Sequence, residues 1–356
     1  MPYGFGMAVP RPRGTARLRE DADGPSNNRG TALRLAGGIR NKLLRAAAAW
    51  LVLLLAWAGP VTAQKRIAFS FDDVPRQAGA FFTPDERTRE LIVALRRGGV
   101  AQAGFFVTTG NLQRPDGAGG EVRIDAYVSA GHVIGNHSTT HPWLSRTETE
   151  DYILEIDRAE AWLRGRPGYR PWFRYPFLDE GRRDLAKRDA VRAALRERGL
   201  RNAYVTIDNY DWHLDALASA ARREGRAMDM EALKTLYVET LVGAADFTDR
   251  IAVETIGRSP AHVILLHETD LAAMFVDDLA AALRADGWEI VTIDEAYRDP
   301  IAAAEPDTWF LNAGRVAALA HIAGREPRTL FHERTDEEVL ARLFDERVLR
   351  TPPAAN

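Results

Sequence analysis

Cysteine is absent from all 356 residues of this sequence. Thiolate zinc sites, cysteine nucleophiles and disulfides are therefore excluded, so any bound metal ion must be held by His, Asp or Glu side chains. An excess of charge of one sign is also missing, because 47 Lys and Arg residues stand against 50 Asp and Glu residues. A nucleic-acid partner is not expected, since nucleic-acid binding requires a basic patch.

Long hydrophobic runs are missing as well. The apolar run at residues 46–58 is shorter than the roughly 20 residues of a membrane-spanning helix. Basic residues precede it and a small-residue pattern ending at Ala63 follows it, which is typical of a secretory signal peptide. We expect residues 1–63 to be a leader and signal peptide, and the protein to be exported to the periplasm or the extracellular space. The alternative is an uncleaved signal that anchors the same domain at the membrane.

Short β-rich runs follow the leader and alternate with helical patterns. Several are apolar almost throughout, as strands buried on both faces are. The repetition of strand and helix indicates a parallel sheet with helices outside, and the number of strands favours an incomplete or distorted (β/α)7 barrel over an open sheet. The predicted strands are residues 66–71, 103–108, 132–136, 172–177, 202–207, 262–266 and 289–293.

Helices are expected between these strands. The best marked begins at Thr83, where Pro84 and Glu86 complete a capping box, and ends near Gly98. Three further helices are predicted by their apolar stripes, at residues 147–164, 182–199 and 271–286.

The interval 213–260 is longer than an ordinary crossover between strands and contains a helical pattern around 229–257. We expect either an insertion above the barrel face or a long connecting helix. After Pro300 the pattern changes to short helices. We therefore divide the exported part into a domain at 65–298 and a helical C-terminal extension at 301–356.

Polar side chains gather where the predicted strands end, and the carboxyl ends of parallel strands share one face of the fold. Taken singly, each has an ordinary structural explanation, such as a turn, a helix cap or a core histidine. Taken together, they combine acids, imidazoles and a guanidinium in the way that metal-assisted hydrolysis requires. These residues are Asp72, Asp73, His137, His141, Arg174, Asp208, Asp211 and His267.

The spacing of His137 and His141 would place both imidazoles on one side of a helical turn, within reach of one ion. An aspartate from a neighbouring strand would complete a set of two His and one carboxylate. A structural zinc site would be closed by a fourth protein ligand, commonly Cys, so the pattern favours an open, catalytic site.

Five short motifs, in order along the chain, resemble those of the polysaccharide deacetylases of carbohydrate esterase family 4, the NodB homology domain. They are "FSFDDVP", "HSTTH", "RYPF", "DNYDW" and "LLH", and the resemblance covers residues 65–298. It implies a distorted (β/α)7 barrel that binds one divalent metal ion, most often zinc. It also implies hydrolysis of N- or O-acetyl groups on an acetylated glycan, such as peptidoglycan, a chitin-like oligomer or an exopolysaccharide.

The resemblance implies a role for each matching residue. The metal ligands would be Asp73, His137 and His141. A water activated by the metal would be the nucleophile, with Asp72 as its general base and His267 as the general acid. Arg174 would hold Asp72 in place, and Asp211 would raise the pKa of His267.

The implied substrate contacts are an apolar pocket for the acetyl methyl group, made by Trp212 and Leu265, and the backbone N–H of Phe177, which would help to stabilise the oxyanion. The aromatic residues Trp143, Tyr210 and Trp288 are candidates for stacking on sugar rings, with core packing an equal candidate for Trp288.

The first motif departs from the family pattern, because Ser70 and Val74 replace a threonine and a glycine. Valine disfavours a positive φ, so a loop that needs glycine at Val74 would have to differ here. Two alternatives to a glycan deacetylase remain open. One is a related amidase acting on a small non-sugar amide, and the other is a non-catalytic glycan-binding barrel.

Overall fold

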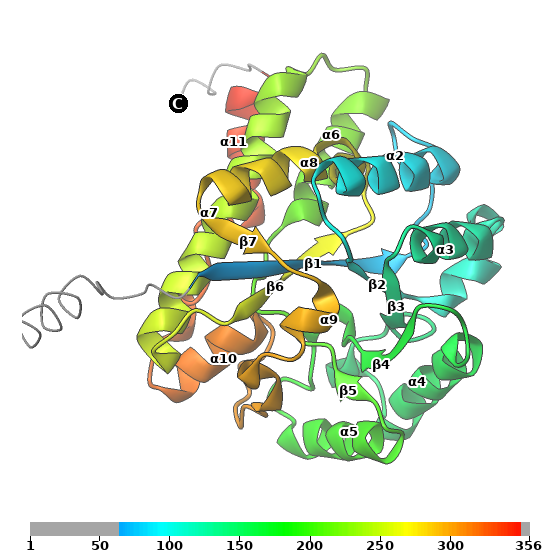
Figure 1. The fold of residues 1–356 in the computed structure, drawn as a ribbon, viewed down its shortest axis with the longest axis vertical. Coiled ribbons are helices and arrows are strands. Elements are labelled where there is room, and N and C mark those ends of the chain that lie inside the picture. Colours follow the sequence, from blue (N-terminus) through cyan, green and yellow to red (C-terminus); the bar gives the residue numbers. More distant parts are fainter. Residues whose placement is uncertain (1–63, 350–356) are drawn as a thin grey trace, which may run out of the picture. The chain divides into compact units, whose positions relative to one another are not determined.

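The computed structural model describes residues 64–349, which contain a single parallel sheet wrapped by helices (Figure 1). The sheet order is β5-β4-β3-β2-β1-β6, and β7 pairs with the start of β1. The strands are β1 (Lys65–Val74), β2 (Gly104–Val107), β3 (Val133–Asn136), β4 (Tyr169–Phe173), β5 (Arg201–Asn202), β6 (Ala261–His267) and β7 (Trp288–Ile290). The predicted parallel α/β architecture is confirmed.

β5 and β6 are the two ends of the hydrogen-bonded path, and no ladder joins them among the described residues. The chain after β5 nevertheless contacts β6 through an isolated parallel bridge between Ile207 and Ile264. The backbone N–H of Leu265 donates to the Ile207 carbonyl at 3.0 Å beside that bridge. The sheet therefore curls into a barrel that is distorted at this seam.

The predicted fifth strand, residues 202–207, is largely wrong, because only Arg201–Asn202 forms a ladder. The fourth strand also ends earlier than predicted, at Phe173. Pro176 cannot donate a ladder hydrogen bond, and Phe177 has a φ of 57°, so the chain turns there instead of continuing as a strand.

Alternation along β1 sorts its side chains between two apolar layers. Phe69 and Phe71 pack with the layer under the outer helices, whereas Ala68 packs with the barrel interior. Because successive side chains of a strand point to opposite faces, Ser70 and Asp72 lie on the same side as Ala68. The first catalytic candidate is thus on the inner face of the barrel.

The predicted helices are present, and the capping box at Thr83 and Glu86 forms as expected. The helices that surround the sheet are α2 (Pro84–Arg97), α3 (Gly120–Ser129), α4 (Thr149–Leu163), α5 (Leu185–Glu197), α8 (Asp270–Ala285) and the short α9 (Ile293–Ala296). α3 was not predicted from the sequence pattern.

The interval 213–260 folds mostly as two helices, α6 (Asp211–Arg223) and α7 (Met230–Ile256). α7 packs against α8 and buries Leu236 and Leu241 in the outer apolar layer (Figure 1). The prediction of an insertion above the barrel face is therefore wrong, and a long helix connecting β5 to β6 describes the segment.

The C-terminal segment contains α10 (Gly314–Ile322) and α11 (Glu337–Arg347), which pack on α7, with α11 also contacting α6. Within residues 64–349, no helix is long and apolar enough to cross a membrane. The predicted leader and signal peptide at 1–63 lie outside the described residues.

Candidate active site

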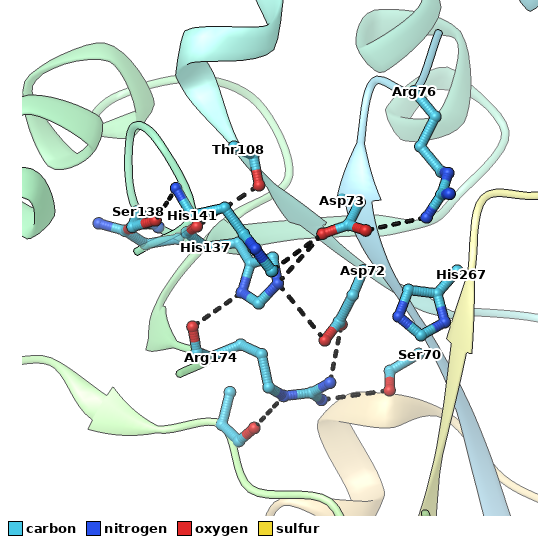
Figure 2. A network of polar contacts seen from close by, with 12 residues as sticks. Ser70, Asp72, Asp73, Arg76, Thr108, His137, Ser138, His141, Arg174 and His267 are labelled. Carbon is cyan, nitrogen blue, oxygen red and sulfur yellow. Dashed lines mark hydrogen bonds and ion pairs between the residues drawn. The ribbon is translucent and has the colours of Figure 1, made fainter. Parts of the chain in front are cut away.

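Asp73, His137 and His141 come together at the carboxyl ends of β1 and β3 (Figure 2). One possible ligand atom from each residue lies within 4.8 Å of the others. Asp73 Oδ1 is 3.1 Å from His141 Nε2 and 3.6 Å from His137 Nε2. The other oxygen, Oδ2, accepts a hydrogen bond from Arg76 at 2.8 Å. One carboxylate oxygen and two ring nitrogens are thus directed at a common point.

The two histidines do not lie on a helical turn, which corrects the sequence prediction. Residues 137–141 form an irregular loop in which Ser138 and His141 have φ values of 66° and 60°. The Ser138 hydroxyl accepts a hydrogen bond from the backbone N–H of His141 at 3.0 Å. This tight loop brings the two rings together, with 4.8 Å between their centroids.

The orientation of His137 is fixed by the backbone. Its Nδ1 lies 2.8 Å from the carbonyl oxygen of Arg174, an acceptor, so Nδ1 carries the proton. Nε2 is left with its lone pair facing Asp72 and Asp73. A histidine ligand whose other nitrogen donates to a carbonyl is the usual arrangement around a bound metal ion.

Asp73, not Val74, takes the unusual backbone conformation in the first motif. Its φ is 68°, a conformation that aspartate tolerates better than most residues, while Val74 stays in β1 and pairs with Val107 of β2. A valine in place of the family's glycine is therefore compatible with this loop.

Arg174 holds Asp72 next to the three possible metal ligands. Arg174 Nη1 donates to Asp72 Oδ1 at 2.7 Å, and both side chains are buried. Arg174 also donates to Ser70 Oγ at 3.1 Å, to the Tyr297 hydroxyl at 3.2 Å and to the carbonyl of Ala203. Asp72 Oδ2 lies 3.6 Å from His137 Nε2. Asp72, Ser70 and Tyr297 thus surround the Arg174 guanidinium, an arrangement that we call the Arg174 cradle. Sequence reasoning gave Ser70 and Tyr297 no role.

His267, at the end of β6, forms a pair with Asp211 at the start of α6. Asp211 Oδ1 lies 2.8 Å from His267 Nδ1, and Oδ2 accepts the backbone N–H of the same histidine at 2.8 Å. Burial lowers the pKa of His267, but the Asp211 charge and hydrogen bond outweigh it and raise the pKa to about 9. The ring is thus protonated at neutral pH.

The electrostatics of the three clustered residues suit a cation. Burial lowers the pKa of His141 to about 3, with the His137 ring adding to the effect. Burial would raise the pKa of Asp73, but the neighbouring His137, His141 and Arg76 side chains hold it well below the usual range. A neutral His141 ring and an ionised Asp73 carboxylate are protonation states that a divalent metal ion requires of its ligands.

A cavity of about 520 Å³ opens over these groups, and Phe177, Trp212 and Leu265 line it, as the resemblance implied. Of the three aromatic candidates for sugar stacking, Trp143 and Tyr210 line the cavity. Trp288 does not, because it is only 2% exposed and packs in the core.

Two aromatic side chains form a platform at the cavity wall. The rings of Trp143 and Phe177 are stacked with 3.8 Å between their centroids and 4° between their planes. Phe177 is 42% exposed, so a sugar ring could reach it.

Sequence reasoning missed several residues of the cavity wall. Three of them, Asn312, Phe331 and Glu337, come from the C-terminal segment, where no strand end marks them. Asp208 also lines the cavity, and burial raises its pKa to about 7. The motif "DNYDW" had singled out Asp208, but no role followed from the resemblance.

Comparison with known proteins finds similarity to polysaccharide deacetylases. Residues 59–203 match the family model for polysaccharide deacetylases. A curated relative, the peptidoglycan-N-acetylglucosamine deacetylase PgdA of Listeria monocytogenes, is 24% identical over 238 residues, which cover 67% of this chain and 40% of the relative. A peptidoglycan-N-acetylglucosamine deacetylase of Bacillus cereus is 30% identical over 121 residues, or 34% of this chain and 38% of the relative.

Among solved structures, a family 4 carbohydrate esterase from Streptomyces lividans in complex with acetate is similar, with 21% identity and a TM-score of 0.42. The match covers 65% of this chain and 95% of that structure. The chain spans about two fifths of the length of the curated relatives it matches. The resemblance inferred from the motifs is confirmed by the polysaccharide deacetylase model, which matches residues 59–203.

Proposed function

We propose that this protein is a metal-dependent hydrolase that removes acetyl groups from an acetylated glycan, with the N-acetylglucosamine of peptidoglycan as the first substrate to test. One observation supports this most strongly. A single cavity contains the Asp73, His137 and His141 cluster together with Asp72 and His267, a carboxylate and an imidazole outside that cluster. The names of the curated relatives suggest the glycan.

Asp73, His137 and His141 would hold the metal ion, and zinc fits the set of two imidazoles and one carboxylate. A divalent ion bound there would polarise the acetyl carbonyl and lower the pKa of water. The ion pair of Asp73 with Arg76 occupies only Oδ2 and leaves Oδ1 for the ion.

Asp72 is the proposed general base. Its contact with Arg174 fixes the carboxylate, while Oδ2 remains on the side of His137. Asp72 takes the proton of the water that attacks the acetyl carbon. Asp72 directly precedes the proposed ligand Asp73 in the chain and lies 3.6 Å from His137 Nε2, so the base and the proposed ligands face the same site.

His267 is the proposed general acid. When the tetrahedral intermediate collapses, the C–N bond breaks and the protonated ring gives its proton to the leaving amine nitrogen. Asp211 keeps the ring in the charged form and fixes its orientation through two hydrogen bonds. The products are acetate and a glucosamine unit.

The acetyl group would be received between Trp212 and Leu265, which line the same cavity. The backbone N–H of Phe177 is the proposed oxyanion donor, and its ring stacks on Trp143 beside the cluster of possible ligands, 4.3 Å from the His141 ring. A volume of about 520 Å³ bordered by aromatic rings suits a sugar better than a small amide.

The proposal is tested by acetate release from N-acetylglucosamine oligomers and from peptidoglycan fragments, with zinc and again with a chelator. We expect release that the chelator stops and added zinc restores. Simple amides serve as a second substrate arm. Turnover of amides alone would favour the small-amide alternative, and no turnover of any substrate by metal-loaded protein would favour the non-catalytic barrel.

Two variants separate the base from the metal site. Asp72→Asn is expected to lower turnover by roughly 10² to 10⁴ while the protein still binds one zinc ion, because Asp72 is not a ligand. His137→Ala is expected to lose the metal. Asp125→Asn, on the exposed surface of α3, and His321→Ala, away from the cavity, are the matched controls. A fully active Asp72→Asn protein would contradict the mechanism.

Export is also proposed, on the basis of the signal-peptide pattern. The predicted cleavage after Ala63 would fall just before β1, which begins at Lys65, so removal of the leader would spare the whole sheet. The test is expression with the native leader in a Gram-negative host, followed by fractionation and N-terminal sequencing. A mature chain beginning at Gln64 in the periplasm is expected, and a full-length cytoplasmic chain would refute the proposal.

A further inference from the structure

A second cavity lies away from the catalytic one and is lined by residues of β4, β5, α5 and α10. Its volume is about 150 Å³, and none of the residues that line it also lines the catalytic cavity. A single water needs roughly 10–15 Å³, so there is room for a group much larger than water. Four arginines and one carboxylate line it, namely Arg192, Arg196, Arg201, Arg315 and Glu305.

Arg315 is the unusual member of this set. It is only 7% exposed, yet no carboxylate lies within 4.0 Å of it among residues 64–349. Its hydrogen bonds run from Nη1 to the carbonyls of Ile301 and Ala302, and its guanidinium lies over the ring of Tyr204 at 4.0 Å. A buried charge without a counter-charge is costly, so a ligand that supplies one is favoured.

The neighbouring acids do not form an ion pair with Arg315, although the charge of Glu180 acts on it from a distance. Glu180 accepts two hydrogen bonds from Arg192 at 2.8 and 3.0 Å, and Glu305 pairs with Arg196 at 3.3 Å. Each nearby acid is thus paired with another arginine, and the four arginines that line the cavity outnumber the acids beside them.

Two further donors in this wall lack partners. The indole N–H of Trp172 and the hydroxyl of Tyr204 are buried and have no hydrogen-bond partner among the described residues. Both side chains line the cavity and are at most 5% exposed. Buried polar groups are seldom left unpaired, so a small shift of either side chain toward the cavity would give its hydrogen a partner in an acceptor bound beside Arg315.

We propose that this cavity binds an oxyanion, a phosphate or carboxylate group, between Arg315, Trp172 and Tyr204. The guanidinium fork matches the two oxygens of such a group, and the indole and phenol hydrogens add donors without adding an acceptor that would repel it. The group belongs to a small molecule or to the end of a larger one, because 150 Å³ leaves no room for a sugar chain. The site does not depend on the deacetylase reaction.

The test is isothermal titration calorimetry of the purified protein with inorganic phosphate, sulfate and succinate, at constant ionic strength against chloride. We expect one saturable site for at least one of the three anions. Phosphate or sulfate binding with no succinate binding identifies a phosphoryl-type group, and the reverse identifies a carboxylate. No saturable binding by any of them overturns the proposal.

Variants assign the binding to this cavity. Arg315→Gln is expected to weaken it at least about tenfold, and Tyr204→Phe, which removes a hydroxyl that has no partner, about tenfold. Arg325→Gln changes the charge equally on the chain just after α10, away from the cavity, and should leave the affinity within twofold. Unchanged affinity in Arg315→Gln, or equal weakening in Arg325→Gln, refutes the site. If Arg315→Gln does not fold, Tyr204→Phe and Trp172→Phe decide, and unchanged affinity in both refutes it.

Discussion

Replacing Asp211 with asparagine tests how the proposed acid is kept protonated. The two carboxylate oxygens of Asp211 accept the Nδ1–H and the backbone N–H of His267. Asparagine retains one acceptor and loses the charge. Because burial by itself lowers the pKa of a histidine, the pKa of His267 in the variant should fall from about 9 to 6.5 or below.

The size of the effect depends on pH. At pH 8, an acid of pKa 9 is about 90% protonated and one of pKa 6.5 only about 3%, so the variant should lose roughly thirtyfold in kcat from this cause. At pH 6 both are mostly protonated, and the same cause accounts for less than about twofold. Activity that needs the protonated ring disappears as pH rises through its pKa, so the alkaline limb should move to lower pH.

The assay is acetate release from a saturating glycan oligomer between pH 5 and 10, with the metal content of each protein checked. Asp215→Asn is the control. Asp215 lies on the same helix as Asp211, but it accepts a hydrogen bond from the backbone N–H of Leu271 and not from His267. Its profile should follow the parent protein. If the alkaline limbs of Asp211→Asn and the parent coincide, Asp211 does not set the pKa of the acid.

Three other substitutions give separate tests. Gly79→Ala should lower the free energy of unfolding in urea by roughly 1–3 kcal/mol, because a Cβ there would lie 1.9 Å from Oδ2 of the buried Asp270; unchanged stability would contradict this packing. Phe331→Ala should raise KM for a glycan oligomer several-fold with kcat nearly unchanged, and a fall in kcat alone would exclude a purely binding role. Arg174→Lys should lower kcat at least about tenfold without loss of metal, because an ammonium cannot reproduce the guanidinium contacts to Asp72 and Ser70. Full activity would show that these contacts are not needed to position Asp72.

The sequence predicted most of the sheet because parallel strands buried on both faces are short apolar runs that local composition reveals. It also predicted which polar residues meet, since the ends of parallel strands share one face. Asp73 precedes both His137 and His141 by more than 60 positions in the sequence, and the structure brings the three residues together. Their roles in binding and chemistry stay predictions.

The errors arose where local pattern does not determine the conformation. The two histidines were placed on a helical turn by their spacing, but the Ser138 hydroxyl and two residues with positive φ form an irregular loop that serves the same purpose. Residues 202–207 do not form the predicted strand. Thr206 and Ile207 make isolated backbone hydrogen bonds with β6 at the seam instead of a continuous ladder.

The contribution of the C-terminal segment could not be foreseen, because it depends on how α10 and α11 pack on α6 and α7. Asn312, Phe331 and Glu337 carry no motif and follow no strand, yet they line the catalytic cavity. The anion site is similar, since Arg315 resembles any helix arginine until its burial and its missing carboxylate partner are known.

The pairing of β1 has a consequence for how the chain folds during synthesis. β1 is the first strand described and pairs along nearly its whole length with β6, and Ser70 bonds the carbonyl of Ile264 across 194 positions of sequence. A ribosome adds roughly 5–20 residues each second, so this apolar strand waits on the order of 10 s or more for its partner. Until then β1 has one unpaired edge, so pairing of this edge with another copy of the chain competes with folding.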